Sequence, residues 1–148
     1  MKYSFSLQTA RKAFIYKKRS KDLRNTLYAI ITFSVLLMIA ISYQLHLNNL
    51  TTDINVISNK TIQAIENKDY EKAETLLSQI ENKWNKNYKI LMGFQDHSSV
   101  NSASIFLHLA LNNYNTKEYS QVADNLINFT SILNELASEN IPYAENIL

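Results

Sequence analysis

Glycine and proline are almost absent from this chain of 148 residues, which contains one of each and no cysteine. The two residues average about 7% and 5% of protein sequences, and β-sheets use them at hairpins, bulges and edges. An all-β fold is therefore close to excluded, as are phosphate-binding loops and dinucleotide folds, which need clustered glycines. The lack of cysteine removes disulfides, thiolate metal sites and thiol nucleophiles.

Acidic residues are scarce at the N-terminal end of the chain. Residues 1–24 carry eight Lys or Arg against one Asp, a net charge of +7, whereas residues 25–148 carry a net charge of −5. The basic residues are Lys2, Arg11, Lys12, Lys17, Lys18, Arg19, Lys21 and Arg24. A basic end on an acidic body is typical of nucleic-acid binding, of binding to anionic lipid, or of a membrane topology signal.

The segment that follows the basic end has no charge at all. No Asp, Glu, Lys or Arg occurs from Asn25 to Thr52, and residues 26–45 form an apolar run of 20 residues. A helix of roughly 20 residues spans the hydrocarbon layer of a bilayer, which is about 30 Å thick. We therefore expect a transmembrane helix at 26–45, with Tyr28 and Tyr43 near its two interfaces.

The distribution of basic residues predicts the orientation of this span. The net charge of +7 precedes it, and the first Lys or Arg after it is Lys60. By the positive-inside rule, a basic arm at 1–25 stays in the cytosol and residues 46–148 lie outside the cell. The chain is then a single-pass protein of the cell membrane with an uncleaved signal anchor.

Cleavage after Ser42 is the alternative to an anchor. Ala40 and Ser42 satisfy the small-residue rule of a signal peptidase site, and cleavage would release a soluble domain that starts at Tyr43. The apolar run is longer than the roughly 7–15 residues of a signal peptide, which favours the anchor.

The basic arm has two interpretations. Tyr3, Leu7, Ala10 and Phe14 recur on one face of a helix, so the arm can lie on the inner leaflet as an amphipathic helix. Its basic residues from Arg11 onward would then face anionic lipid. The other interpretation is a frayed basic tail that only sets topology. We expect no nucleic-acid partner, because a polybasic segment beside a span is the usual topology signal.

Apolar residues after the span recur every three or four positions, which predicts a small all-α bundle of about four helices. The predicted helices are 47–65, 70–91, 100–114 and 119–136. Their apolar stripes are Leu47, Leu50, Ile54, Ile57, Ala64 and Ile65; Tyr70, Ala73, Leu77, Ile80, Trp84 and Leu91; Val100, Ala103, Phe106, Leu107, Ala110, Leu111 and Tyr114; and Tyr119, Val122, Leu126, Phe129, Leu133 and Leu136. The first stripe can continue the membrane helix outward without a break.

Short polar segments separate the predicted helices. Asp69 and Thr116 are expected to cap the second and fourth helices through side-chain oxygens. Residues 93–99 are predicted to form a loop that holds the only glycine. Pro142 is expected to end regular structure and leave residues 143–148 as a short tail.

The chain contains a weak internal repeat. Residues 68–73 and 117–123 align at an offset of 49, with one inserted residue. The acid-Tyr-x-x-Ala start resembles tetratricopeptide hairpins, in which a small Ala lets two helices approach. Two copies are fewer than the three that such arrays need. We therefore predict two antiparallel hairpins packed on each other, not a solenoid.

The sequence contains few candidates for metal-binding or catalytic residues. His46, His97 and His108 are far apart in sequence, so their spacing predicts no metal site. Asp96 and His97 precede two serines, but adjacent residues cannot form the hydrogen-bond relay of a catalytic triad. The residues expected to act as turn or capping residues there are Asp96, Ser98 and Ser99.

The remaining candidates are an aromatic residue and four acids. Trp84 fits the core, with its polar tip reaching out, and an aromatic binding box is the alternative. The acids are Glu66, Glu71, Glu74 and Glu81, which fall on polar helix faces as solvated charges. Because none of these four forms an isolated pair among apolar neighbours, no general acid is indicated. We expect neither an enzyme nor a cofactor.

The layout of a basic start, one span and an acidic helical part resembles an uncharacterised bacterial membrane family, domain of unknown function 4363. The residues that carry the resemblance are 66–73, Trp84, Asp96-His97 and 145–148, and it covers Leu27 to Leu148. The resemblance implies a low-GC, often spore-forming bacterium, a cell-surface location and no established activity. It adds weight to His97 and to the C-terminal residues. The long basic arm departs from the family pattern.

Two classes of function follow. The first is a membrane-anchored module whose hairpins bind another protein of the bacterial cell envelope. A multi-span partner would be reached through the side of the span that carries Thr32, Ser34 and Ser42. The second is an envelope sensor that binds a small ligand, an ion or a proton near Asp96 and His97, with the basic arm reporting inside.

Overall fold

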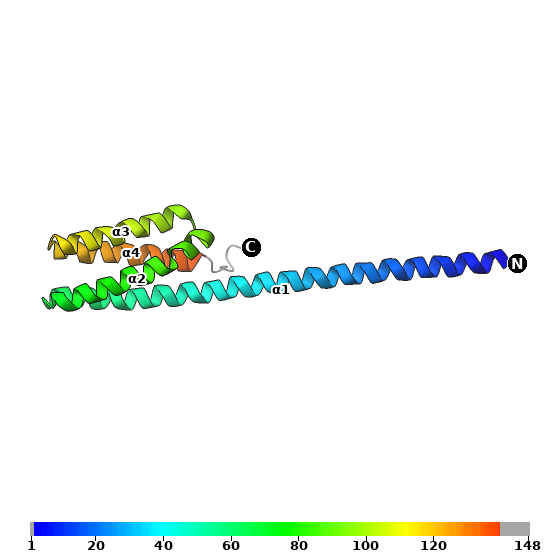
Figure 1. The fold of residues 1–148 in the computed structure, drawn as a ribbon, viewed down its shortest axis with the longest axis horizontal. Helices are drawn as coiled ribbons and strands as arrows, with labels where there is room; N and C mark the ends of the chain where they lie inside the picture. The colour runs from blue at the N-terminus through cyan, green and yellow to red at the C-terminus, as the bar shows by residue number, and fades with distance from the viewer. Residues whose placement is uncertain (1, 140–148) are drawn as a thin grey trace, which may run out of the picture. The chain divides into compact units, whose positions relative to one another are not determined.

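The structure is a computed structural model that describes the backbone of residues 2–139 and the side chains of residues 23–138. This part of the chain is all-α, with four helices: α1 (Lys2–Glu66), α2 (Tyr70–Phe94), α3 (His97–Asn115) and α4 (Tyr119–Glu139) (Figure 1). The all-α prediction and the number of helices are confirmed. Pro142 and residues 143–148 lie outside the described residues.

The chain divides into two compact units, residues 1–43 and residues 44–148. In the first unit the backbone is helical from Lys2, in place of a frayed basic tail. The side chains of residues 23–42 are exposed, and none of the most apolar window of α1 is buried. A core helix of a soluble protein would be mostly buried. By length and composition, α1 therefore holds a segment able to cross a membrane or to serve as a signal sequence.

The second unit is an antiparallel bundle in which the C-terminal part of α1 lies beside both α2 and α4. On the α2 side, His46 shares a hydrogen bond of 2.7 Å with Asn87, and Lys83 forms an ion pair of 2.7 Å with Asp53. On the α4 side, the Gln44 amide donates to the carbonyl oxygen of Ala137 over 2.8 Å. Further along α1, the Thr51 hydroxyl donates to the carbonyl oxygen of Leu133 over 3.5 Å. In both pairs of helices, positions later in α1 therefore face positions earlier in the partner helix, as antiparallel packing requires.

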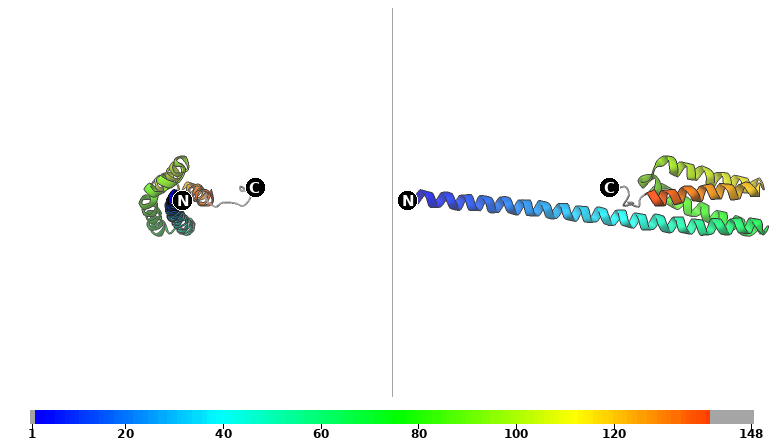
Figure 2. Two further views of the ribbon diagram at one scale, coloured as in Figure 1. Left: turned by 90° about the vertical axis from the view of Figure 1, so that its right-hand side faces the viewer. Right: turned by 180° about the vertical axis from the view of Figure 1, so that it is seen from behind.

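The third helix completes the ring of helices. The Tyr88 hydroxyl of α2 donates to Asn101 of α3 over 3.1 Å, and the Asn113 amide of α3 donates to Gln121 of α4 over 3.2 Å. Viewed from one end, the four helices of this unit surround a common centre (Figure 2). Contact between the first and last helices closes the bundle, as expected of two packed hairpins and not of an open solenoid.

The predicted core is largely confirmed. The buried apolar side chains are Leu47, Leu50, Ile54, Ala64, Ile65, Ala73, Leu77, Ile80, Trp84, Leu91, Val100, Ala103, Leu107, Ala110, Val122, Leu126, Phe129, Leu133 and Leu136. Expected core residues that remain half-buried are Ile57, Tyr70, Phe106, Leu111, Tyr114 and Tyr119. Periodicity finds the centre of a stripe reliably, whereas burial at its edge depends on how close the next helix lies.

Four polar side chains that hydropathy did not predict are also buried: Thr51, Ser58, Thr61 and Asn113. They are small enough to lie between packed helices. The Thr61 hydroxyl donates back to the carbonyl oxygen of Ile57 over 2.9 Å, so its burial leaves no donor unsatisfied.

The two hairpin turns have the same backbone hydrogen bonds, shifted by the 49 residues of the sequence repeat. In the first turn, Lys68 N–H donates to Ile65 and Asp69 N–H donates to Ala64. In the second turn, the equivalent donors are Lys117 and Glu118, and their acceptors are Tyr114 and Asn113. This is the Schellman arrangement of helix C-termini, which places one residue in the left-handed region.

That left-handed residue is a lysine in both turns, Lys68 with φ of 59° and Lys117 with φ of 64°. The prediction that Asp69 caps α2 is confirmed, because its side chain accepts from Lys72 N–H over 3.3 Å. The prediction for Thr116 is wrong. Thr116 is the C-cap of α3, and α4 begins only at Tyr119.

The predicted loop at 93–99 is also wrong, because helix occupies most of it. α2 includes Gly93 and continues to Phe94, and α3 begins at His97, so only Gln95 and Asp96 connect the two helices. The Asp96 side chain accepts from Ser99 N–H over 2.8 Å and thereby starts α3 at once. A side-chain cap lets two helices meet with a shorter connection than the sequence suggests.

Candidate functional site

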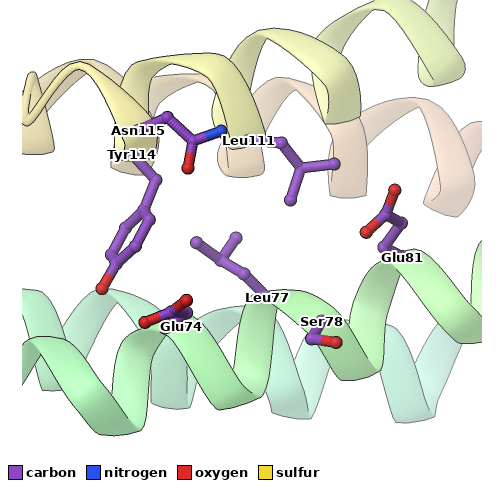
Figure 3. A pocket seen from close by; sticks show the side chains of 7 residues that line it. All are labelled: Glu74, Leu77, Ser78, Glu81, Leu111, Tyr114 and Asn115. Carbon is purple, nitrogen blue, oxygen red and sulfur yellow. The ribbon is translucent and has the colours of Figure 1, made fainter.

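A groove between α2 and α3 is a concave feature of the described residues. Its volume is about 320 Å³, which is at the small end of the range for ligand pockets. Its lining comes from two antiparallel helices (Figure 3): Glu74, Leu77, Ser78, Glu81, Leu111, Tyr114 and Asn115. A groove of this size has room for one or two side chains of a bound partner.

The α2 wall of the groove is acidic. Glu74 and Glu81 are seven residues apart, which is about two helical turns, and both therefore lie on the edge of α2 that faces α3. Glu74 is exposed and Glu81 is half-buried. No Lys or Arg lines the groove, so its field is negative.

The floor of the groove is apolar. Leu77 of α2 is only 2% exposed, and Leu111 of α3 is half-buried. The two side chains point toward each other across the groove (Figure 3). Negative charge at the rim and apolar carbon at the floor match a side chain with a long aliphatic stem and a cationic head, such as Lys or Arg.

A tyrosine cluster, formed by Tyr70, Tyr114 and Tyr119, closes one end of the groove. The Tyr114 hydroxyl donates to the carbonyl oxygen of Tyr70 over 2.6 Å. The rings of Tyr70 and Tyr119 are stacked with centroids 4.2 Å apart, and Tyr114 meets Tyr119 edge-on at 5.7 Å. The cluster joins the two hairpin turns, so it holds both helices of the groove in register.

Burial raises the pKa of Tyr114 above its ordinary value, and the negative charge of nearby Glu74 adds to the rise. The hydroxyl therefore stays protonated at neutral pH and keeps donating to the Tyr70 carbonyl. In the groove Tyr114 acts as a fixed wall and not as a base.

The groove lacks the parts of a reaction centre. Among the described residues, no group of three or more His, Asp or Glu side chains is placed to hold a metal ion. The lining contains one hydroxyl of a serine, Ser78, but no histidine that could activate it. The arrangement is suited to binding.

Trp84, one of the candidates from the sequence, is a core residue. It is 1% exposed, its indole N–H donates to the Ser104 hydroxyl over 3.0 Å, and its ring meets Phe129 edge-on at 5.3 Å. The core interpretation is confirmed, and the aromatic binding box is excluded because solvent does not reach the ring.

Asp96 and His97 lie together at the start of α3 but do not join Trp84 in one site. The Asp96 carboxylate accepts from the backbone N–H and the hydroxyl of Ser99, and these bonds lower its pKa. The predicted capping role is confirmed for Asp96. His97 is exposed at the first position of α3, so a ligand site at this pair stays a prediction.

The lipid-facing residues predicted in the basic arm can be placed only in part. Arg24 is exposed on α1. The others lie on the helical backbone of α1, and their side chains are outside the described part: Arg11, Lys12, Lys17, Lys18, Arg19 and Lys21.

The groove residues were missed because each wall belongs to a different helix. From the sequence alone, Glu74 and Glu81 are expected to be solvated charges on a polar face. The available signal was their seven-residue spacing on either side of Leu77, which places both acids on one edge of the apolar stripe. Which helix that edge faces cannot be derived from local spacing.

A comparison with models of protein families finds no match to this chain, and searches of curated proteins and of solved structures find none either. The resemblance to the membrane family described above therefore stays a prediction.

Proposed function

We propose that the chain is a membrane-anchored helical module that binds another protein of the bacterial cell envelope through the groove between α2 and α3. Residues 26–45 form its single span, the basic arm lies in the cytosol at anionic lipid, and the bundle lies outside the cell. The observation that carries the binding role is a negative rim above an apolar floor.

The anchor is supported by α1 itself. Its apolar segment is long enough to span a bilayer, and none of the most apolar window is buried. The charge difference between residues 1–24 and the rest of the chain supports a cytosolic N-terminus. The resemblance stated above agrees with a cell-surface location.

The chemistry of the partner follows from that of the groove. Two carboxylates on one wall and no basic residue in the lining favour a segment that presents Lys or Arg. The facing leucines favour a segment that also buries aliphatic carbon. We therefore propose a basic amphipathic segment as the bound element, with the negative charge of residues 25–148 steering its approach.

Site-specific photocrosslinking in cells tests this proposal. A photoreactive residue at Ser78, in the lining of the groove, is expected to give a defined crosslinked product with a second protein. The double substitution Glu74→Lys and Glu81→Lys should abolish that product, because it makes the rim repel a basic segment.

The matched control reverses two charges away from the groove. Asp124 and Glu135 are exposed on α4, so Asp124→Lys with Glu135→Lys makes the same change in net charge. The control should keep the crosslinked product. A product that survives reversal of the groove charges, or that both double variants lose, contradicts binding through the groove.

A further inference from the structure

α3 has two apolar stripes, and only one of them faces the core of the bundle. The apolar residues of the core stripe are Val100, Ala103, Leu107 and Ala110. The second stripe, here called the outer stripe, consists of Ile105, Phe106 and Leu109. Ile105 is 57% exposed, Leu109 is 42% exposed and Phe106 is half-buried. Leu109 lies four residues after Ile105 and three after Phe106, so the three side chains are neighbours on the helix surface.

The exposed surface of α3 is uncharged. No Asp, Glu, Lys or Arg occurs in this helix, and its two histidines, His97 and His108, count as neutral at pH 7. Beside the outer stripe, α3 exposes the neutral amides of Asn101 and Asn112. A surface helix usually turns charged residues to water, as α2 and α4 do. Exposed apolar side chains without charge are typical of the centre of a protein interface.

The outer stripe lies on a different side of α3 from the groove. Leu111 lines the groove. Leu109 is two residues before Leu111, which corresponds to a turn of about 200° around the helix axis. Ile105 is six residues before Leu111 and is turned by about 120° from it. A protein bound to the outer stripe therefore leaves the groove open.

The charge pattern favours a second copy of this chain as the occupant of the outer stripe. The net charge of −5 on residues 25–148 makes two copies repel each other, and this repulsion is weakest where α3 brings no charge into the contact. An acidic or basic partner would find no complementary charge there. In a two-fold symmetric pair, the same apolar patch lies on both sides of the contact. Two α3 helices that cross antiparallel would place Ile105 of each chain against Leu109 of the other.

We infer that two copies of this chain pair through α3 and bury their outer stripes against each other. The inference does not depend on binding in the groove. A contact through one helix of each chain is smaller than the roughly 800 Å² per partner of a standard interface, so the pair is reversible. If the groove binds a basic segment as proposed, the pair presents two grooves and binds a partner with two such segments with avidity.

Energy transfer between labelled copies tests the pairing in the full chain, which has no cysteine of its own. Ser131→Cys places a fluorophore at an exposed position of α4. Chains that carry a donor are mixed with chains that carry an acceptor in mild detergent, with micelles in excess over chains. Energy transfer should appear, and an excess of unlabelled chain should remove it by competition.

Ile105→Lys and Ile127→Lys form a matched pair of variants, because the native side chains are 57% and 56% exposed. Ile127 is seven residues before Asn134, whose side chain accepts from Asn55 of α1 over 2.8 Å, so Ile127 lies on the side of α4 toward α1 and not toward α3. Lysine at position 105 brings two ammonium groups into the contact and should weaken pairing by about tenfold or more. Ile127→Lys should leave the energy transfer unchanged.

Three results would overturn the inference. Absence of transfer between the labelled chains leaves the outer stripe to a different occupant. Transfer that survives Ile105→Lys means that the chains pair through another surface, such as the apolar segment of α1. Loss of transfer in both lysine variants contradicts a contact confined to α3.

A second measurement avoids the added charge. Ile105→Cys and Ile127→Cys are treated with a short bismaleimide in separate samples of the full chain. Pairing through α3 raises the local concentration of the two thiols at position 105, so Ile105→Cys should form a covalent dimer about tenfold faster than Ile127→Cys. Equal rates at the two positions also overturn the inference.

Discussion

Two lysines adopt the backbone conformation that glycine usually takes at the end of a helix. A residue with a Cβ atom in the left-handed region costs about 1–2 kcal/mol, and glycine avoids that cost. The scarcity of glycine, which excludes sheet folds at the level of composition, thus leaves strain in both hairpin turns. Lys68 and Lys117 carry it at equivalent positions of the repeat.

We expect Lys68→Gly and Lys117→Gly each to raise the free energy of unfolding by about 0.5–1 kcal/mol, after the entropy lost by glycine on folding. Urea denaturation of the full chain in detergent measures the change. Lys60→Gly is the control, because Lys60 is exposed within α1 and a glycine there should cost about 1 kcal/mol. Destabilisation by all three substitutions contradicts the strain argument.

The Asp96 cap predicts acid sensitivity at the start of α3. Its pKa is lowered in the folded state, so its contribution to stability is present above the ordinary pKa of Asp, about 4, and is lost as pH falls through the lowered value. Asp96→Ala should destabilise the bundle at pH 7, and Asp96→Asn should restore part of the loss. Thermal unfolding as a function of pH measures both.

The neighbouring histidine separates capping from sensing. If Asp96 only caps α3 and no sensing site is present, His97→Ala should leave the free energy of unfolding unchanged between pH 5 and pH 8, since His97 is exposed. A change in that range would favour the sensor hypothesis, in which a ligand, an ion or a proton binds near Asp96 and His97.

At the other end of the bundle, the raised pKa of Tyr114 predicts a loss of folding stability at alkaline pH. Because its pKa is higher in the folded state, its contribution is complete below about pH 10 and is lost as pH rises through the raised value. Tyr114→Phe should lower the free energy of unfolding by about 1 kcal/mol at pH 7, through loss of the bond to Tyr70. The variant should also show a flatter decline above pH 10 in denaturation experiments.

At the scale of the element, α1 buries three hydroxyl residues, and two of them, Ser58 and Thr61, differ in their hydrogen bonding. The Ser58 hydroxyl is buried without a hydrogen-bond partner, whereas the Thr61 hydroxyl donates to Ile57. Ser58→Ala removes an unsatisfied group and improves helix propensity, so it should stabilise the bundle by about 1 kcal/mol. Thr61→Ala removes a satisfied group and a buried methyl, and should destabilise it. Urea denaturation curves of the two variants and of the unsubstituted chain measure both changes in the free energy of unfolding. Stabilisation by both substitutions would contradict this interpretation.

The helices themselves were predictable because their signals are local. Spacings of three and four residues found the stripes of α2 and α4, and the side chain of Asp69 marked the start of α2. The start of α4 was not predictable. The Thr116 hydroxyl suits either a cap of the following helix or, as observed, a bond back to Asn112 in the preceding helix. Only the conformation of Lys117 decides between them.

At the scale of the whole molecule, the anchor predicts the mass of the mature protein. An uncleaved signal anchor leaves a chain of 17.1 kDa that resists alkaline extraction from membranes. Cleavage after Ser42 would give a shorter chain that starts at Tyr43 and is released into solution. Mass spectrometry of the membrane and soluble fractions separates the two outcomes, and recovery of only the shorter chain would overturn the anchor.

The sequence by itself determined the all-α class, the four helices, the apolar segment of α1 and most of the core, because each follows from the spacing of neighbouring residues. Only the tertiary structure decided that α1 closes on α4, that Ser58 and Asn113 enter the core, and that Glu74 and Glu81 border a groove. These features depend on which helix edge faces which, and that choice is made by packing between residues far apart in the chain. The spacing of apolar residues along one helix therefore does not predict which neighbouring helix each of its edges contacts.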